Sequence, residues 1–443
     1  MKILFVYPNI GQPVTVHHGI ASLSGKLKED GHDISLLMIN AKPYPHYRKA
    51  ISDFGPDIFC FSIVSNYWEI SCQLAAAIKK DFNKKIFAGG MHCSLFPDSF
   101  TMDTAFDGIC RGEGEEALSE LVVKLENNEP YHYVKNFWFK KNGRILKNDI
   151  RPLIQNLDAL PFPDHQIFRI NGNDVIRRFI FSRGCPYNCS YCSNKAYKDV
   201  IKGKGRTIRF RSVSKAMYEI ENALHGRNIQ TLIFDDDCFN KEKEWFQNFA
   251  REYKKRNLPQ FRCNTRPELC PENDMRLLKE AGCYQINIGI ESGDVDIRKR
   301  ILKRNISDGQ IVRAFNLAKK YELQTFSFNM IGIPGETRQA FKKTIKLNQK
   351  IKPDRLQLSV FYPYPGTELA IRAKEQGIIK EDETYNYFYG SHLKLKNFGE
   401  TEILINKMLF KFNVYRVSSL PKACYHFYLD IRNYLKYIFT KQY

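Results

Sequence analysis

The hydrophobic positions of the chain fall into short runs that predict strands alternating with helices. An apolar run covers residues 3–7, and Ile20, Leu23 and Leu27 then recur at helical spacing until Gly31. Further apolar runs cover residues 34–39, 57–64 and 85–88. Nearly continuous apolar runs are typical of parallel strands that are buried on both faces. The pattern therefore predicts a doubly wound, Rossmann-like α/β domain over residues 1–133.

A second alternating pattern begins at about residue 176. Before it, residues 134–147 alternate apolar and polar positions around Asn142-Gly143, which predicts a hairpin. A proline-rich stretch at 160–164 indicates a linker, so we assign 134–175 to a hairpin and linker. Strand-like runs then recur near residues 177–182, 229–234, 259–263, 284–289, 324–329 and 355–360. Six βα units predict a partial (β/α)6 TIM barrel over residues 176–370, with its chemistry at the carboxyl ends of the strands.

The last segment, 371–443, is predicted to be small and mainly helical. Residues 401–443 hold ten aromatic residues and seven Lys or Arg, but only two acids. A basic, aromatic and amphipathic helix is typical of a peripheral membrane contact. The alternative is that its apolar face closes the barrel or packs on the first domain. The basic residues concerned are Arg416, Lys422, Arg432, Lys436 and Lys441, interleaved with Phe427, Tyr428, Tyr434, Tyr437 and Phe439.

The composition allows several domains. The chain has 443 residues, of which 43% are hydrophobic, enough for two or three domains that each bury a core. It has no uninterrupted apolar run of eighteen residues and no signal-like start, so we expect a cytoplasmic protein. The formal net charge of +20 is spread along the chain. Such a charge attracts nucleic acid, anionic lipid or acidic substrates without choosing between them.

Three closely spaced cysteines are the most informative residues in the chain. Cys185, Cys189 and Cys192 form CxxxCxxC in the run FSRGCPYNCSYCSN. Three thiolates at this spacing can hold three irons of a four-iron cluster and leave the fourth iron open to a small molecule. The alternatives are a zinc site or three unrelated thiols. Zinc sites usually add a paired CxxC or histidines at their own spacing, and the sequence has neither here.

With Tyr191 just before the last cysteine, the motif resembles that of the radical S-adenosylmethionine (SAM) superfamily. Four more segments lie where a predicted barrel strand meets a loop. They are Asp235-Asp236-Asp237, Asn264-Thr265-Arg266, GIESG at 289–293 and GIPGET at 332–337. In this order after the cysteines they resemble the radical SAM pattern across residues 176–370.

The resemblance implies a [4Fe-4S] cluster and a site for SAM. Asp236 would accept from the SAM ammonium, and Arg266 would face the SAM carboxylate as a bidentate donor. Glu291 would accept from ribose hydroxyls or the methionyl amine, and Tyr191 would pack near adenine. One electron from the reduced cluster would cleave SAM into methionine and a 5′-deoxyadenosyl radical, which abstracts hydrogen from unactivated carbon. An electron donor such as flavodoxin or ferredoxin is implied as a partner.

The first domain resembles the cobalamin (B12)-binding domain found in one large branch of this superfamily. The matching elements are Ser62-Ile63-Val64 after the third strand and Gly89-Gly90 with His92 after the fourth. Glycines after a buried strand let the backbone approach a bulky cofactor. The DxHxxG element that supplies an axial histidine in other cobalamin proteins is missing, and His17-His18-Gly19 stands roughly in its place. We expect cobalamin without a protein imidazole; the alternative is a domain that has lost the cofactor.

Together these motifs favour a cobalamin-dependent radical SAM enzyme, a methyltransferase that acts on an unactivated carbon. A second hypothesis keeps both cofactors but closes or rearranges a ring without methyl transfer. A third, resembling tRNA methylthiotransferases, would explain the positive charge but needs an auxiliary cluster, with Cys60, Cys72, Cys93 and Cys110 as the available ligands. A fourth is a non-enzymatic cobalamin or cluster sensor. We expect a small-molecule or lipid-like substrate rather than nucleic acid.

Overall fold

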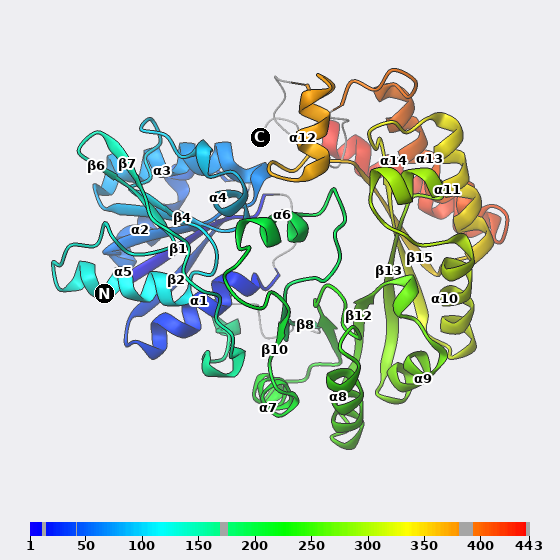
Figure 1. The fold of residues 1–443 in the computed structure, drawn as a ribbon, viewed down its shortest axis with the longest axis horizontal. Helices are drawn as coiled ribbons and strands as arrows, with labels where there is room; N and C mark the ends of the chain where they lie inside the picture. Colours follow the sequence, from blue (N-terminus) through cyan, green and yellow to red (C-terminus); the bar gives the residue numbers. More distant parts are fainter. Residues whose placement is uncertain (11–14, 41, 169–175, 381–392, 440–443) are drawn as a thin grey trace. The chain divides into compact units, whose positions relative to one another are not determined.

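A computed structural model describes residues 1–10, 15–40, 42–168, 176–380 and 393–439 (Figure 1). The chain divides into two compact units. The first consists of Met1–Gly184 with Ala196–Asn228, and the second of Cys185–Lys195 with Ile229–Tyr443.

A seven-stranded sheet forms the centre of the first unit. In spatial order its strands are β2 (Asp33–Ile39), β1 (Lys2–Pro8), β3 (Ile58–Ser62), β4 (Lys85–Gly89), β5 (Gly108–Cys110), β6 (Phe137–Lys141) and β7 (Arg144–Lys147). The first five strands pair in parallel, and β6 and β7 are antiparallel. The order β2-β1-β3-β4-β5 is that of a doubly wound fold, which confirms the predicted Rossmann-like domain.

Both faces of this sheet are buried. Its helices are α1 (His18–Glu29), α2 (Arg48–Phe54), α3 (Trp68–Phe82), α4 (Met91–Leu95) and α5 (Glu115–Glu126). Successive residues of a strand point to opposite faces. Accordingly Phe5 belongs to a core that includes residues of α1 and α5, whereas Leu4 and Val6 belong to a second core with residues of α3. This explains why the strands are continuous apolar runs in the sequence.

The hairpin predicted around Asn142-Gly143 is present and extends the first sheet. Asn142 and Gly143 have φ values of 50° and 70°, the left-handed pair that a two-residue type I′ turn requires. β6 pairs with β5, which places Trp138 opposite Ile109 and covers an edge that the short strand would otherwise expose. Between β7 and β11 (Thr231–Phe234) of the second unit, the sequence forms β8 (Ile176–Phe179), β9 (Ser182–Arg183), α6 (Ser193–Val200), β10 (Arg209–Phe210) and α7 (Val213–Leu224).

A parallel sheet with a helix between successive strands forms the second unit. Its strands are β11 (Thr231–Phe234), β12 (Gln260–Thr265), β13 (Cys283–Glu291), β14 (Gln324–Ile331) and β15 (Arg355–Val360), and its helices are α8 (Lys243–Lys255), α9 (Glu272–Glu280), α10 (Asp308–Lys320) and α11 (Arg338–Ile351). Each strand pairs with the next one in the chain. Within this unit the sheet order is β15-β14-β13-β12-β11. With β8 of the first unit, all six predicted strands are present, and they follow one another along the chain as in a partial (β/α)6 barrel.

The C-terminal segment is mainly helical, with α12 (Glu368–Glu375), α13 (Glu400–Tyr415) and α14 (Leu420–Phe439). Phe410 of α13 shares a core with Leu358 of β15, and Ala423 of α14 belongs to the same core. The rings of Phe412 and Phe427 lie 5.8 Å apart between the two helices. α13 therefore covers the last barrel strand, which agrees with the prediction that the apolar face of this segment closes the barrel. Among the described helices, none is long and apolar enough to cross a membrane.

Candidate functional site

The three predicted cluster ligands lie on one loop of the second unit. Cys189 is buried, and Cys185 and Cys192 are half-buried. Among the described residues, no three Cys, His, Asp or Glu side chains stand close enough together to hold a metal ion as they are. Three thiols on one short loop are nevertheless the donor set that a four-iron cluster with one open iron needs. They are the residues of this chain that fit such a cluster.

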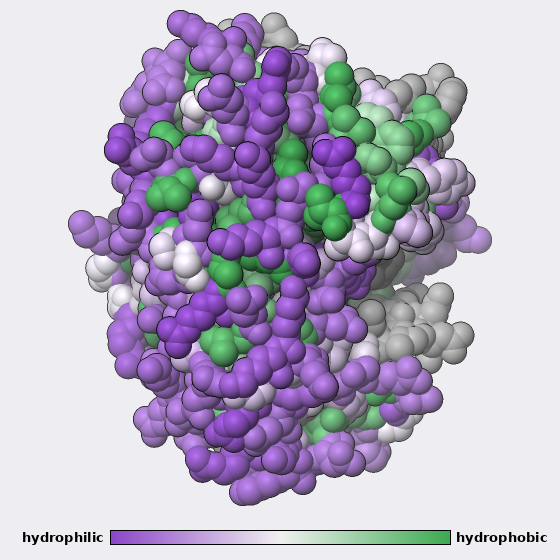
Figure 2. All heavy atoms as spheres, turned by 90° about the vertical axis from the view of Figure 1, so that its right-hand side faces the viewer, coloured by the Kyte–Doolittle hydropathy of each residue, from purple (hydrophilic) through white to green (hydrophobic). Residues whose placement is uncertain are grey.

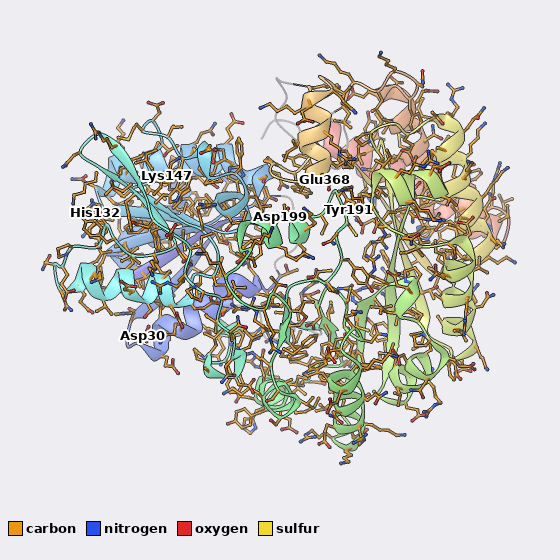
Figure 3. All side chains as sticks on the ribbon, viewed as in Figure 1. Asp30, His132, Lys147, Tyr191, Asp199 and Glu368 are labelled. Atoms are coloured by element: carbon orange, nitrogen blue, oxygen red, sulfur yellow. The ribbon has the colours of Figure 1, made fainter. Side chains whose placement is uncertain are left out.

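Hydrogen bonds fix the middle of this loop. The Ser190 N–H donates to the Leu302 carbonyl at 3.2 Å, and the Ser190 carbonyl accepts from the Leu369 N–H at 2.9 Å. The loop is thereby tied to the segment after β13 and to the start of α12. Figure 3 shows Tyr191 of the loop near Glu368, the first residue of that helix.

Two buried arginines meet at Cys189. Arg266 follows β12 and donates from Nη1 to Cys189 Sγ at 3.4 Å, and Arg304 Nη1 lies 4.0 Å from the same sulfur. Both arginines are less than a tenth exposed. Both guanidinium groups are cations, so this pair suits an anionic cluster ligand at that sulfur. The Arg266 guanidinium also stacks on Tyr187, with its central carbon 3.6 Å from the ring centroid.

Arg304 also contacts two of the residues predicted to bind SAM. Its Nη1 donates to Tyr191 Oη at 3.3 Å and lies 3.7 Å from Glu291 Oε1, while Nη2 donates to the Gly289 carbonyl at 2.6 Å. Glu291 has a φ of 67°, a left-handed conformation that a glutamate keeps only where its surroundings hold it. Burial raises the pKa of Glu291, and the Arg304 charge opposes that rise. Tyr191 and Glu291 are thus gathered beside the arginines of the cysteine loop.

The sequence analysis did not identify Arg304. It lies thirteen residues after Glu291, in the run Leu302-Lys303-Arg304-Asn305. In a strongly basic chain, nothing in the sequence distinguishes one buried arginine from the many exposed ones. The available signal was indirect: a glutamate at the carboxyl end of a buried strand needs a cation close by.

A fourth cysteine lies next to the loop. Cys238 is buried, and a hydrogen bond between its thiol and that of Cys185 lowers the pKa of Cys185 to about 7. The pKa of Cys192, by contrast, is raised to about 12 by burial. At the other end of the loop, Asn194 Nδ2 donates to Asp237 Oδ1 at 2.9 Å. The turn after β11 therefore contacts both ends of the cysteine loop, which the sequence spacing does not reveal.

The same turn carries Asp236, the remaining residue predicted to bind SAM. Asp236 is fully buried. Phe234 of β11 pairs with Cys263 of β12, so Asp236 and Arg266 follow strands that end at the same edge of the sheet. Asn264 of β12 donates from Nδ2 to the Asp236 carbonyl at 3.3 Å.

In the first unit, the residues predicted to bind cobalamin lie at the carboxyl edge of the sheet. Ser62 ends β3, Gly89 ends β4, and the two pair in register. A β-carbon at Gly89 would meet its nearest neighbour, Cys110 Cβ, at 3.6 Å, which is an ordinary contact. Gly90 differs, because its φ is 95° and a β-carbon there would lie 2.7 Å from the Ile63 carbonyl oxygen. The fold itself therefore requires glycine at position 90, whereas a β-carbon at position 89 would fit without a clash.

The histidines near this edge already have partners. His17 Nδ1 accepts from a backbone N–H of α1 at 3.2 Å, and its Nε2 lies 3.4 Å from Ser62 Oγ. Burial lowers the pKa of His17 to about 4. The ring nitrogens of His92 lie 3.1 Å and 3.0 Å from the hydroxyls of Ser65 and Ser99, and burial lowers its pKa to about 4 as well. Neither ring can become an axial ligand without breaking one of these contacts.

Comparison with known protein families identifies two domains. Residues 12–122 match the model of the B12 binding domain, and residues 179–347 match that of the radical SAM superfamily. The resemblance drawn from the motifs is therefore confirmed. The exact domain boundaries and the roles of individual residues stay predictions.

Three characterised or named relatives extend over most of the chain. An uncharacterised methyltransferase of Pyrococcus horikoshii is 29% identical and covers 83% of this chain and 82% of the relative. An anaerobic magnesium-protoporphyrin IX monomethyl ester cyclase of Cereibacter sphaeroides is 26% identical, covering 96% and 72%. A hopanoid C-3 methylase of Methylococcus capsulatus is 26% identical, covering 79% and 67%.

Two solved structures share the fold. The radical SAM methyltransferase TsrM from Kitasatospora setae has a TM-score of 0.70 at 17% identity, over 85% of this chain and 76% of TsrM. The cobalamin-dependent radical SAM enzyme OxsB has a TM-score of 0.74 at 15% identity, over 98% of this chain and 70% of OxsB. At such identities the likeness establishes the architecture.

Replacing Cys189 by alanine is expected to abolish cluster assembly, because it removes one of three thiolate ligands and leaves two buried cations without their anionic partner. Iron and acid-labile sulfide content after anaerobic reconstitution measures the effect. Cys185→Ala and Cys192→Ala should behave alike. Cys424→Ala, at an exposed cysteine of the same unit, should keep a full cluster. A full cluster in Cys189→Ala would contradict the ligand assignment.

Gly89→Ala and Gly90→Ala are expected to act differently on the first unit. Gly90→Ala should destabilise the cofactor-free protein by about 1–3 kcal/mol, because its β-carbon strikes the backbone at a left-handed φ. Gly89→Ala should leave that stability almost unchanged. It should weaken corrinoid binding, because the added methyl group would stand between the Gly89 backbone and the approaching cofactor. Chemical unfolding and the absorption spectrum of protein loaded with cobalamin separate the two effects. Unchanged corrinoid affinity in Gly89→Ala would rule out a close approach of the cofactor there.

Proposed function

We propose that this chain, which matches the B12 binding domain over residues 12–122 and the radical SAM superfamily over residues 179–347, methylates an unactivated carbon in a cobalamin-dependent reaction. The observation that carries the proposal is the meeting of Arg266 and Arg304 at Cys189, beside Glu291. Its cofactors are a [4Fe-4S] cluster, SAM and cobalamin. When bound, the cluster and SAM supply a 5′-deoxyadenosyl radical, and cobalamin supplies a transferable methyl group.

The polar groups around Cys189 match the charges of the amino-acid end of SAM. Guanidinium groups suit a carboxylate, which accepts two parallel hydrogen bonds from one arginine. Arg266 and Arg304 would therefore hold the SAM carboxylate. Asp236 and Glu291 would accept from the ammonium or the ribose hydroxyls, and Tyr191, whose hydroxyl Arg304 contacts, would pack near adenine. Asp236, Arg266 and Arg304 are buried, and the exclusion of water from them strengthens each interaction.

The first unit would hold cobalamin at the edge formed by Ser62 and Gly89. Gly89 has no side chain to cover its backbone at this edge, although the fold would accept one, and this fits the close approach of a cofactor tail. The engagement of His17 with Ser62 and with α1 supports a cobalt without a protein imidazole. An electron donor such as flavodoxin or ferredoxin would reduce the cluster.

A second candidate is radical ring closure or rearrangement with the same cofactors. The similarity to a magnesium-protoporphyrin IX monomethyl ester cyclase along nearly the whole chain favours it. The two reactions would use the same SAM-binding residues and differ in their products. Methylation adds one methyl group derived from SAM, and ring closure adds none.

The methylthiotransferase hypothesis would need a second cluster in the first unit. Cys60 belongs to the core on one face of the sheet, with Cys110 packed against it. Cys93 belongs to the core on the other face, with Cys72 packed against that one. Four thiols divided between two faces of a sheet are poorly placed to surround one cluster, which argues against this hypothesis.

Isotope labelling is expected to distinguish the candidate reactions. Protein produced with cobalamin and reconstituted anaerobically should contain about four irons per chain, as one four-iron cluster requires, and should show a corrinoid absorption spectrum. Incubated with a reductant, methyl-labelled SAM and a small-molecule and lipid extract of the source cells, it should form 5′-deoxyadenosine and a product that carries the label. An unlabelled product of changed structure would favour ring closure. About eight irons would favour the methylthiotransferase, and no 5′-deoxyadenosine in any extract would favour the sensor.

We further propose that α14 brings the protein to an anionic membrane surface and so to a lipid-like substrate, as the similarity to a hopanoid C-3 methylase also suggests. Tyr425 and Tyr428 of this helix are 60% and 62% exposed, and Leu420 and Leu435 are exposed as well. Arg432 is exposed on the same helix. Apolar and basic side chains on one helix are typical of interfacial binding. Figure 2 shows a face of the molecule that is largely hydrophilic, with hydrophobic areas scattered over it.

Not every residue expected at this surface is available to it. Lys422 donates to the Asp354 carbonyl at 2.8 Å and lies over the Tyr415 ring at 4.0 Å. Phe427 packs against Phe412. Lys441 lies outside the described residues, as do the side chains of Lys436, Tyr437 and Phe439.

Removing the exposed apolar groups of α14 is expected to abolish vesicle binding. The variant Leu420→Ser with Tyr425→Ser and Tyr428→Ser should lose sedimentation with vesicles of mixed phosphatidylcholine and phosphatidylglycerol, which the intact protein should show at low salt and lose at high salt. Tyr218→Ser, a matched change at a tyrosine of α7 that is 60% exposed, should bind like the intact protein. Binding that survives the triple change, or none by the intact protein, would refute the membrane role.

A further inference from the structure

A line of amide side chains runs along the inner strands of the second unit. Asn264 of β12 pairs in register with Asn287 of β13, and Gln285 lies two residues before Asn287. Side chains two residues apart in a strand share a face. Asn264 therefore lies on the same face as Arg266, and Gln285 and Asn287 lie on one face of β13.

Three hydrogen bonds join these amides to the turn after β11. Gln285 Nε2 donates to Asn287 Oδ1 at 2.7 Å, Asn287 Nδ2 donates to Asn264 Oδ1 at 3.0 Å, and Asn264 Nδ2 donates to the Asp236 carbonyl at 3.3 Å. The last acceptor sets the direction of the whole line. A backbone carbonyl can only accept, so Asn264 must present its amino group to it and its oxygen to Asn287, and the same requirement passes on to Gln285.

The fold alone gives no reason for this line. Gln285 is fully buried and Asn287 is 9% exposed, and among the described residues none gives the Gln285 Oε1 atom a hydrogen bond. Burying amides costs free energy unless every polar atom is paired, whereas apolar side chains fill a core without that cost. The neighbouring positions of β13, Ile286 and Ile288, are apolar and fully buried. A line of buried amides with an unpaired end at Gln285 therefore indicates a function at its other end, the turn that carries Asp236.

We propose that Asn264, held by Asn287 and Gln285, is a positioning residue for Asp236; this rests on the proposed function, in which Asp236 accepts from the SAM ammonium. Asn264 holds the turn at two points. Its side chain donates to the Asp236 carbonyl, and its own carbonyl accepts from the Phe239 N–H at 3.0 Å. Loss of the amide would let the Asp236 backbone shift and would weaken the contact of its carboxylate with SAM, while the cysteine loop keeps its own anchors.

The test is the affinity of the reconstituted, cluster-loaded protein for SAM, measured by calorimetry and by the change that SAM causes in the electron paramagnetic resonance spectrum of the reduced cluster. Asn264→Leu should weaken SAM binding roughly fivefold, as the loss of one neutral hydrogen bond predicts. Iron content should not change.

Asn348→Leu is the matched control. Asn348 of α11 is also a fully buried amide of the second unit, bonded to Ser327 at 2.7 Å and to Asn329 at 2.8 Å. Its loss should lower the midpoint of thermal unfolding, as the loss of Asn264 should, but should leave SAM affinity within twofold of the unaltered protein.

A double-mutant cycle with Asp236→Asn separates positioning from general destabilisation. If Asn264 acts through Asp236, Asn264→Leu should have little further effect on SAM affinity once Asp236 has been changed. Additive losses, or unchanged affinity in Asn264→Leu, would overturn the inference. If Asp236→Asn itself leaves SAM affinity unchanged, the proposed contact of Asp236 with SAM fails instead, and unaltered protein that binds no SAM would refute the proposed function.

Discussion

Two guanidinium groups, those of Arg266 and Arg304, face one buried cysteine sulfur, and the candidate site depends on how their charge is balanced. Two buried cations this close together repel each other unless anions accompany them. Within the protein, Glu268 lies 2.7 Å from Arg266, and Glu291 lies 3.7 Å from Arg304. Thiolates and a bound carboxylate would add the remaining negative charge at the same place. This balance of charge explains the left-handed conformation of Glu291, because in that conformation its carboxylate lies beside Arg304.

The topology of a parallel sheet supplies these charges from separate parts of the chain. Asp236 follows β11, Arg266 follows β12 and Glu291 ends β13, and parallel neighbours all end at one edge. Side chains alternate between the two faces of a strand. Asn264, two residues before Arg266, therefore lies on the same face as Arg266. Asn264 of the amide line and Arg266 of the candidate SAM site therefore follow one pattern, with polar residues at every second position from Arg262 of β12 to Arg266 just after it.

The sequence was sufficient for the strands, the hairpin and the cysteine loop, because each depends on local pattern. The apolar runs of the first unit predicted strands buried on both faces, and Asn142-Gly143 predicted its turn. It was not sufficient for Arg304, Cys238 or the line from Gln285 to Asp236, because each acquires its partner through contacts between segments far apart in the chain. Gly89 and Gly90 illustrate the limit most clearly. They look equivalent in sequence, but the backbone of Ile63 requires Gly90 to be glycine, whereas a β-carbon at Gly89 would make only ordinary contacts.

A further group of charges lies in the first unit, at Arg183, just before the cysteine loop in the sequence. Arg183 stands two residues before Cys185 and belongs to the first unit, where it lies 2.8 Å from Glu113 and 2.6 Å from Glu115. Burial alone would raise the pKa of Glu115, but the Arg183 charge lowers it below its usual value. The carboxylate therefore stays ionised, and the ion pair holds at neutral pH. A buried pair of this kind tolerates little displacement, since separating its partners leaves charges without compensation. Arg183 is therefore a fixed point of the first unit, and the chain passes from it into the cysteine loop two residues later.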